Sequence, residues 1–314
     1  MLSNQIATSN IKMKTYQQLW QSLTPLYDAG EAQAIVRTVL DVEYGMTLTD
    51  IIGGKVNELS ADEGRKLEEI IIRLQKGEPV QYVLGEADFA GRPFHVEPGV
   101  LIPRPETAEL CQWIEEDMIE KSIVSSGDSS EDSSGNSPQA TDDARRILDI
   151  CTGSGCIAIT LGLNIPNSEV TGWDISEDAL RIAQGNVEMM KAGNVRIEHQ
   201  DALALPKAAE AADLIVSNPP YICEKEKADM EKNVLEHEPS LALFVPDEDP
   251  LKFYRAIAEY ASSALKSEGA LYFEINPIYE KETREMLQEL DFKDIETKED
   301  AFGKKRMMRA KSTK

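Results

Sequence analysis

The sequence lacks several features that would place it outside ordinary globular proteins. It has no run of roughly 18 apolar residues that could span a bilayer. Its first residues lack the apolar centre of a secretory signal, so we expect a cytoplasmic protein with no membrane partner. Its four cysteines form no C-x-x-C pair and its three histidines are scattered, so neither disulfides nor a metal site are expected.

Positive charge is also scarce. Lysine and arginine total 33 against 56 acidic residues, which gives a net charge of −23. Such a field repels phosphate backbones, so we expect no direct nucleic-acid partner. The acidity either attracts a cationic cofactor or a basic protein, or serves only solubility.

The length of 314 residues exceeds the ~150 residues of one typical domain and favours two. Residues 1–82 predict a small helical bundle. The spacing of one buried helical face occurs at Leu67, Ile70, Ile71 and Leu74. Ser60 and Glu63 form a capping box that begins this helix.

Residues 83–121 predict a connector. Glycines separate short β-rich runs as far as Val100, which is typical of a hairpin. A helix then begins at Pro105, with Glu106 at its positive end, and is expected to run to about Lys121.

Residues 122–143 predict a disordered Ser/Asp-rich insertion. Seven serines lie between Ser125 and Ser137, interleaved with acidic residues and without a large apolar side chain. Such a segment cannot bury enough surface to fold.

Residues 144–314 alternate between strand and helix patterns. Strands are expected at 146–150, 169–173, 195–199, 213–217 and 270–275. Helices are expected at 176–191, 251–266 and 279–290. This alternation predicts a doubly wound α/β domain with a largely parallel sheet.

A glycine-rich loop follows the first of these strands. Its candidate cofactor-binding residues are Asp149, Thr152, Gly153, Ser154 and Gly155. Asp174 ends the second strand 19 residues beyond Gly155, the interval at which an acidic side chain reaches a ribose. The pattern fits a dinucleotide or S-adenosylmethionine, or a tight turn without a ligand.

Two further acidic residues bear on this choice. Asp149 favours S-adenosylmethionine, because its carboxylate can meet the ammonium group of that cofactor or help to order the loop. Asp201, followed by Ala202, can accept a hydrogen bond from an adenine amino group or simply cap a turn.

The motif Asn218-Pro219-Pro220-Tyr221 follows the fourth strand. The Asn218 side-chain oxygen and the Pro219 carbonyl can accept the two hydrogens of a planar NH₂ group, and Tyr221 can pack on its flat face. In a doubly wound sheet the first and fourth strands are neighbours, so Gly153 and Asn218 should emerge side by side. This predicts methyl transfer to a planar nitrogen.

These motifs together resemble the HemK/PrmC family, the protein-(glutamine-N5) methyltransferases of peptide chain release factors. The resemblance extends over nearly the whole chain. The segments that carry it are 79–82, 85–91, 100–107, 151–156, 218–221 and 238–244. The chain departs from the family pattern at Ala202, Pro250 and Asn276, where an aromatic residue, a glycine and a glycine are usual.

The resemblance implies methylation of the glutamine amide in the Gly-Gly-Gln loop of release factors, with S-adenosylmethionine as donor. It implies a Rossmann-like seven-stranded methyltransferase domain at 144–314 and a substrate-recognition domain at 1–82. Thr152 to Gly155 would hold the methionine part, Asp174 the ribose, and Asp201 and Ala202 the adenine. Asn218 to Tyr221 would bind the substrate amide, and we expect a monomer.

Other interpretations remain at this stage. The main alternative is a nucleic-acid amino methyltransferase acting on adenine N6 or guanine N2, which the net charge disfavours. The chain could also be a ribosome-associated adaptor or a dehydrogenase, but neither function explains the motif from Asn218 to Tyr221. Arg104 and Glu106 either order the substrate loop or only begin a helix. The basic residues after Gly303 form either an RNA-contacting patch or a basic edge strand.

Overall fold

The computed structural model describes residues 14–127, 144–207 and 211–314. Contacts divide the chain into a small unit, which ends at Gly85 and also includes Lys232–His237, and a large unit, Glu86–Glu231 with Glu238–Lys314. Of the expected insertion, residues 128–143 lie outside the described residues. Residues 122–127 belong to helix α6 (Pro105–Gly127), which therefore continues beyond the predicted end near Lys121.

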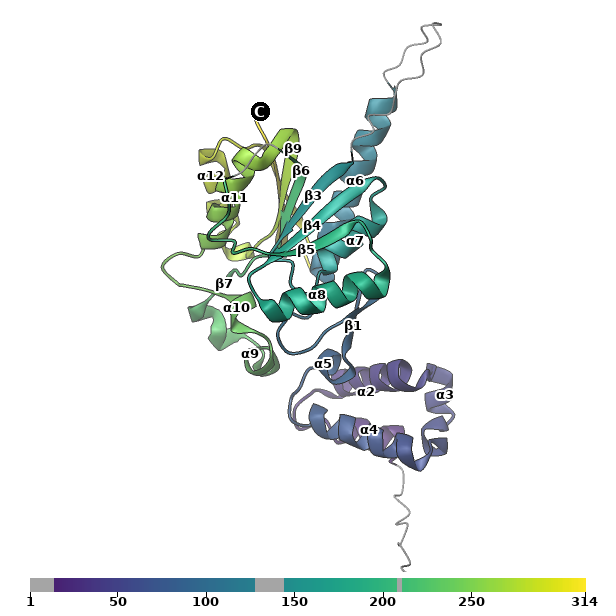
Figure 1. The fold of residues 1–314 in the computed structure, drawn as a ribbon. Coiled ribbons are helices and arrows are strands. Elements are labelled where there is room, and N and C mark those ends of the chain that lie inside the picture. Colours follow the sequence, from purple (N-terminus) through teal and green to yellow (C-terminus); the bar gives the residue numbers. More distant parts are fainter. Residues whose placement is uncertain (1–13, 128–143, 208–210) are drawn as a thin grey trace, which may run out of the picture. The chain divides into compact units, whose positions relative to one another are not determined.

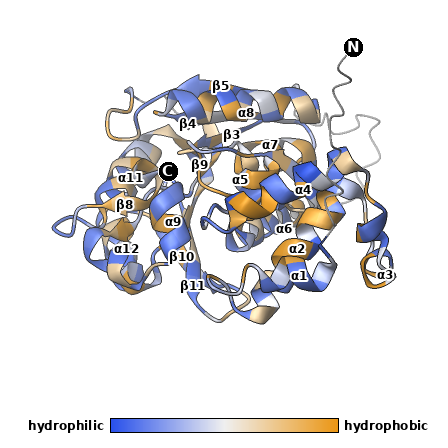
Figure 2. Ribbon diagram, turned by 90° about the horizontal axis from the view of Figure 1, so that it is seen from below, coloured by the Kyte–Doolittle hydropathy of each residue, from blue (hydrophilic) through white to orange (hydrophobic). Residues whose placement is uncertain are grey.

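The small unit is helical, as predicted. Its helices are α1 (Tyr16–Gln21), α2 (Ala29–Tyr44), α3 (Leu48–Ile52), a 3₁₀ turn (Lys55–Glu58), α4 (Ala61–Leu74), α5 (Val80–Leu84) and α9 (Lys232–His237). The capping box at Ser60 and Glu63 is present, and the predicted face of α4 is buried in the core of this unit. In Figure 2, α2 and α4 each carry hydrophobic and hydrophilic residues, as expected of helices with one buried face.

The large unit begins with the predicted hairpin. Its strands are β1 (Glu86–Phe89) and β2 (Arg92–His95), which pair antiparallel. Ala90 and Gly91 both have positive φ at the turn. Helix α6 then begins at Pro105, with Glu106 in its first turn, as expected.

A seven-stranded sheet forms the centre of the large unit, in the order β10-β11-β9-β6-β3-β4-β5. The strands are β3 (Arg145–Ile150), β4 (Ser168–Asp174), β5 (Val195–His199), β6 (Ala212–Ser217), β9 (Leu265–Glu274), β10 (Lys293–Glu299) and β11 (Lys305–Lys311). The first five are parallel, and β11 runs antiparallel to β9 and β10. The doubly wound α/β prediction and the pairing of β3 with β6 are confirmed.

Helices cover both faces of this sheet (Figure 1). One face packs against α6, α7 (Cys156–Asn164) and α8 (Glu177–Met190), and the other against α11 (Lys252–Ala264) and α12 (Glu280–Glu289). Successive strand residues alternate between the two cores: Ile147 belongs to the first and Leu148 to the second. This alternation is the period of a strand buried on both faces.

Shorter elements follow β6 and β9. They are β7 (Ile222–Cys223), a 3₁₀ turn (Glu224–Asp229), α10 (Ser240–Leu243), β8 (Phe244–Val245) and a 3₁₀ turn (Pro277–Tyr279). β7 and β8 pair in parallel. Among the helices of the described residues, none combines the length and apolar character needed to cross a membrane.

The interpretation of the basic C-terminal segment as an edge strand is wrong. β11 lies between β9 and β10, and β10 forms the edge. The cations of β11 face carboxylates of neighbouring elements. The pairs are Lys305–Glu280, Arg306–Asp300, Arg309–Asp117, Arg309–Glu296 and Lys311–Asp294. The basic residues of β11 are therefore explained by ion pairs within the fold, at a position one strand in from the edge of the sheet.

Candidate active site

The glycine-rich loop connects β3 to α7 through a sharp turn. Cys151, Gly153 and Gly155 all have positive φ, at 64°, 56° and 80°. At Gly155 a Cβ would lie 3.1 Å from the Ile159 side chain and 3.2 Å from that of Ala183. Glycine is needed here both for the backbone conformation and for the close packing. The loop therefore brings its backbone N–H groups to the beginning of α7.

Asp149 lies behind this loop and is 0% exposed. Its Oδ2 accepts hydrogen bonds from the Thr152 hydroxyl at 2.5 Å and the Ala158 N–H at 3.1 Å. Oδ1 has no partner among the described residues. Burial raises the pKa of Asp149 to about 7. Of the two interpretations given to this carboxyl, its contacts correspond to the ordering of the loop.

Asp174 joins the loop to the end of β4. Its Oδ2 accepts from the Gly153 N–H and its Oδ1 from the Ser176 N–H, both at 2.9 Å. Burial raises its pKa, whereas these backbone donors favour the charged form. The carboxylate is therefore held in one orientation at the carboxyl edge of the sheet.

Asp201 and Ala202 follow β5 at the same edge. Asp201 accepts from the Leu203 N–H at 2.8 Å, so it caps a turn. Both residues also line the cavity described below, and Ala202 is buried.

The residues after β6 differ in their exposure to this cavity. Asn218 and Pro220 line it, whereas Pro219 and Tyr221 are not among its lining residues. The Tyr221 hydroxyl donates to Glu274 at 3.1 Å and its ring packs against the second core. Tyr221 therefore supports the motif through Glu274 and the second core and does not line the cavity.

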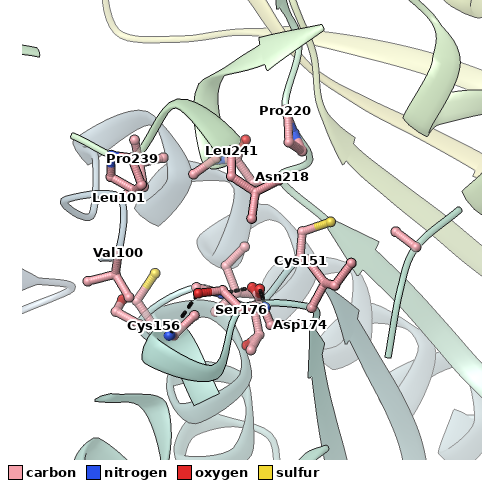
Figure 3. A pocket seen from close by; sticks show the side chains of 18 of the residues that line it. Val100, Leu101, Cys151, Cys156, Asp174, Ser176, Asn218, Pro220, Pro239 and Leu241 are labelled. Atoms are coloured by element: carbon pink, nitrogen blue, oxygen red, sulfur yellow. Dashed lines mark hydrogen bonds between the residues drawn. The ribbon is translucent and has the colours of Figure 1, made fainter. Parts of the chain in front are cut away.

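One cavity of the large unit collects most of the predicted site residues. Its lining includes Thr152, Gly153, Ser154, Asp174, Asp201, Ala202, Asn218 and Pro220. Asp149 and Gly155 lie outside the lining. Figure 3 shows Asn218 and Pro220 toward one side of the cavity and Asp174 and Ser176 toward the other. The glycine loop and the end of β6 meet there because β3 and β6 are neighbours.

The segment before α6 contributes a wall that the sequence reasoning did not assign. The Glu238 carboxylate accepts from Arg104 at 2.5 Å and from the Ile102 N–H at 3.1 Å. Arg104 and Pro239 both line the cavity. Arg104 therefore joins two lining segments, whereas Glu106 lies in the first turn of α6, 4.0 Å from Arg306. Both segments belong to the stretches that carry the family resemblance, but a pairing across 134 residues has no local signal.

Three more polar residues near the motif received no role from the sequence: Thr107, Glu274 and Asn276. Thr107 accepts from the Asn218 side-chain amide, and Glu274 accepts from the Thr107 hydroxyl. Asn276, noted only as a departure from the family pattern, donates to the Tyr221 carbonyl at 3.2 Å and to Glu226 at 3.1 Å. The sequence signal for Glu274 and Asn276 was their position at the end of a buried strand.

Comparisons with known proteins agree with this geometry. A model described as "Methyltransferase domain" matches residues 141–306, and one described as "PrmC N-terminal domain" matches residues 24–85. The release factor glutamine methyltransferase of Bacteroides thetaiotaomicron is 47% identical over 291 residues, which are 92% of this chain and 96% of that protein. The protein of the same name from Flavobacterium psychrophilum is 38% identical and covers 95% of this chain and 98% of its own.

Among solved structures, the hMettl16 catalytic domain in complex with a 3′UTR hairpin aligns with a TM-score of 0.51. The alignment covers 81% of this chain and 82% of that chain at 14% identity, so it shows a shared fold only.

Fold, cavity and family models together define a Rossmann-like methyltransferase that depends on S-adenosylmethionine. Within that class, the chain belongs to the family of release factor glutamine methyltransferases.

The residues present fit this cofactor. The cavity is lined by the carboxylates Asp174 and Asp201, and Arg104 is the one lysine or arginine that the described part of the chain contributes to the lining. A third carboxyl, Asp149, lies directly behind the loop with one oxygen unpartnered among the described residues. An acidic, partly apolar cavity suits a molecule that carries a sulfonium, an ammonium group and an adenosine.

Proposed function

We propose that this protein transfers a methyl group from S-adenosylmethionine to the side-chain amide nitrogen (N5) of the glutamine in the Gly-Gly-Gln motif of release factors. The observation that carries the proposal is the shared cavity in which Asn218 and Pro220 face the glycine loop and Asp174. The names of relatives that match more than nine-tenths of the chain support the choice of substrate.

The proposed cofactor contacts divide between the glycine loop, for the methionine part, and the ends of β4 and β5, for the adenosine part. Thr152, Gly153, Ser154 and Gly155 would hold the methionine part through their backbone, with Asp149 ordering them from behind. Asp174 would accept from the ribose hydroxyls, and Asp201 and Ala202 would border the adenine.

The substrate amide would bind to the motif that follows β6. The Asn218 Oδ1 and the Pro219 carbonyl accept its two hydrogens, which orients the nitrogen lone pair. S-adenosylmethionine supplies a methyl group already activated by positive charge, so the protein must supply alignment more than a strong base. Pro220 lines the cavity, and Tyr221 supports the motif through Glu274.

We assign recognition of the folded release factor mainly to the small helical unit. A single glutamine side chain offers too little surface, because a standard interface needs ~800 Å² per partner. We further propose that the enzyme acts as a monomer in the cytoplasm without a nucleic-acid partner. The net charge of −23 and the carboxylates that pair with the cations of β11 support the last point.

Mass spectrometry of a purified release factor tests the proposal. After incubation with the enzyme and S-adenosylmethionine, we expect one added methyl group on the Gly-Gly-Gln glutamine. A release factor with that glutamine replaced by alanine is the control and should gain none. Methylation at another residue, or of RNA but not of the release factor, would contradict the proposal.

A further inference from the structure

Asn218 is connected to a buried carboxyl on another strand. Its Nδ2 lies 3.2 Å from the Thr107 hydroxyl oxygen in the first turns of α6. The same hydroxyl lies 2.5 Å from Oε2 of Glu274 at the end of β9. Thr107 and Glu274 are each 2% exposed, so water cannot readily substitute for these contacts.

The Thr107 hydroxyl determines which groups donate and which accept in these two hydrogen bonds. Threonine has one hydroxyl hydrogen and two lone pairs. Because the hydrogen is donated to Glu274, the oxygen can only accept from Asn218. Asn218 must therefore turn its Nδ2 toward Thr107, and its Oδ1, at the opposite edge of the planar amide, remains available.

Glu274 uses its second oxygen in the same way. Oε1 accepts from the Tyr221 hydroxyl at 3.1 Å, and the Glu274 backbone carbonyl accepts from Tyr254 at 3.2 Å. One carboxyl thus holds both ends of the Asn218–Tyr221 motif, directly at the tyrosine and through Thr107 at the asparagine.

We propose that Glu274 and Thr107 are positioning residues for methyl transfer, forming a relay that fixes the amide of Asn218 with Oδ1 toward the substrate. This inference rests on the proposed function, in which Oδ1 accepts a hydrogen from the substrate amide. A reversed amide would present its own NH₂ to the NH₂ of the substrate, a pairing of two donors that cannot form a hydrogen bond.

A matched pair of variants at Thr107 tests the relay. Thr107→Val keeps the shape of the side chain but removes the hydroxyl, and Thr107→Ser keeps the hydroxyl. We expect Thr107→Val to lower kcat by about 10- to 100-fold with little change in S-adenosylmethionine affinity, since an orienting contact is lost. Thr107→Ser should stay within about threefold of wild type. A wild-type rate for Thr107→Val, or an equal loss in both variants, would overturn the relay.

A double-mutant cycle separates positioning from general support of the fold. If Thr107 acts through Asn218, then Thr107→Val should add almost no further loss in an Asn218→Ala background. Losses that multiply would show that Thr107 acts independently of Asn218 and would overturn the inference.

A measurement without release factor keeps the two proposals separate. In ¹⁵N spectra of the full chain, the side-chain NH₂ signal of Asn218 is identified by its loss in Asn218→Ala. That signal should shift and its hydrogens exchange faster in Thr107→Val, but not in Thr107→Ser. An unchanged signal in Thr107→Val overturns the relay. Failure of the wild type to methylate release factor, with the signal still responding, overturns only the proposed substrate.

Discussion

At the scale of single residues, two buried carboxyl groups hold the two parts of the site in place. Asp149 holds the cofactor loop through Thr152 and Ala158, and Glu274 holds the motif after β6 through Thr107 and Tyr221. The two donors that each carboxyl group accepts offset part of the cost of burying it away from water. Both residues lie at strand ends, where a small displacement would change the shape of the cavity.

Asn218→Ala tests the residue proposed to hold the substrate. The variant loses one acceptor for the substrate NH₂ but keeps the glycine loop and Asp174, so calorimetric affinity for S-adenosylmethionine should change little. Loss of such a contact in the transition state costs about 2 to 4 kcal/mol, or about 30- to 1,000-fold in single-turnover methyl transfer. Asn218→Asp keeps an acceptor for the substrate but loses the donor to Thr107, so the relay predicts a loss of turnover in this variant as well. Wild-type turnover in the alanine variant would exclude Asn218 from substrate binding.

Asp149 predicts a specific dependence of stability on pH. Its pKa in the folded chain, about 7, lies above the ordinary value of 3.8 because of burial. The stability that the neutral form contributes is fully present below pH 3.8 and is lost as the pH rises through 7. Asp149→Asn cannot ionise, so its Tm relative to wild type should increase between pH 5 and pH 8, with about 3 kcal/mol involved over this range.

Thermal unfolding without cofactor at several pH values measures this difference. Asp88→Asn removes an exposed carboxyl from the hairpin and controls for the general loss of negative charge. A Tm difference between Asp149→Asn and wild type that does not vary with pH would show that Asp149 remains ionised in the fold.

At the scale of elements, the β3–α7 turn depends on two glycines for different reasons. A Cβ at Gly153 would meet no atom within 4 Å, whereas at Gly155 it would contact Ile159 and Ala183. Both glycines have positive φ, so the backbone cost of a substitution is similar and only the packing differs.

Gly155→Ala should therefore destabilise the protein more than Gly153→Ala. We expect about 1 to 2 kcal/mol for the backbone at Gly153, and about 1 kcal/mol or more in addition at Gly155 for displaced side chains. Urea unfolding of both variants measures the difference. Equal losses would mean that Ile159 and Ala183 move aside without cost.

At the scale of the whole molecule, the two units have separate hydrophobic cores. The core of the small unit uses residues between Tyr16 and Leu84, and the cores of the large unit use residues between Phe89 and Ala310. The cavity and the relay belong entirely to the large unit. Cofactor binding should then depend on the large unit alone.

A fragment that begins at Glu86 tests whether the large unit binds the cofactor and the small unit recognises the release factor. It should unfold cooperatively and bind S-adenosylmethionine within about threefold of the full chain, because its cores and cavity are intact. It should methylate release factor poorly, because most of the proposed interface is missing. Full activity of the fragment would remove the recognition role from the small unit, and loss of cofactor binding would show that the large unit depends on the small one.

The sequence alone determined the alternation of strands and helices, the hairpin, the capped helix α4 and the meeting of the glycine loop with the segment after β6. These features follow from local periodicity, turn residues and the handedness of parallel crossovers, each readable within a short window. Only the tertiary structure decided that β11 lies inside the sheet, that Asp149 lies behind the loop, and that Thr107 meets Glu274 across 167 residues. Such contacts join side chains that are far apart in the sequence and meet only after the chain has folded. A local sequence pattern therefore cannot predict the partner of a buried polar group.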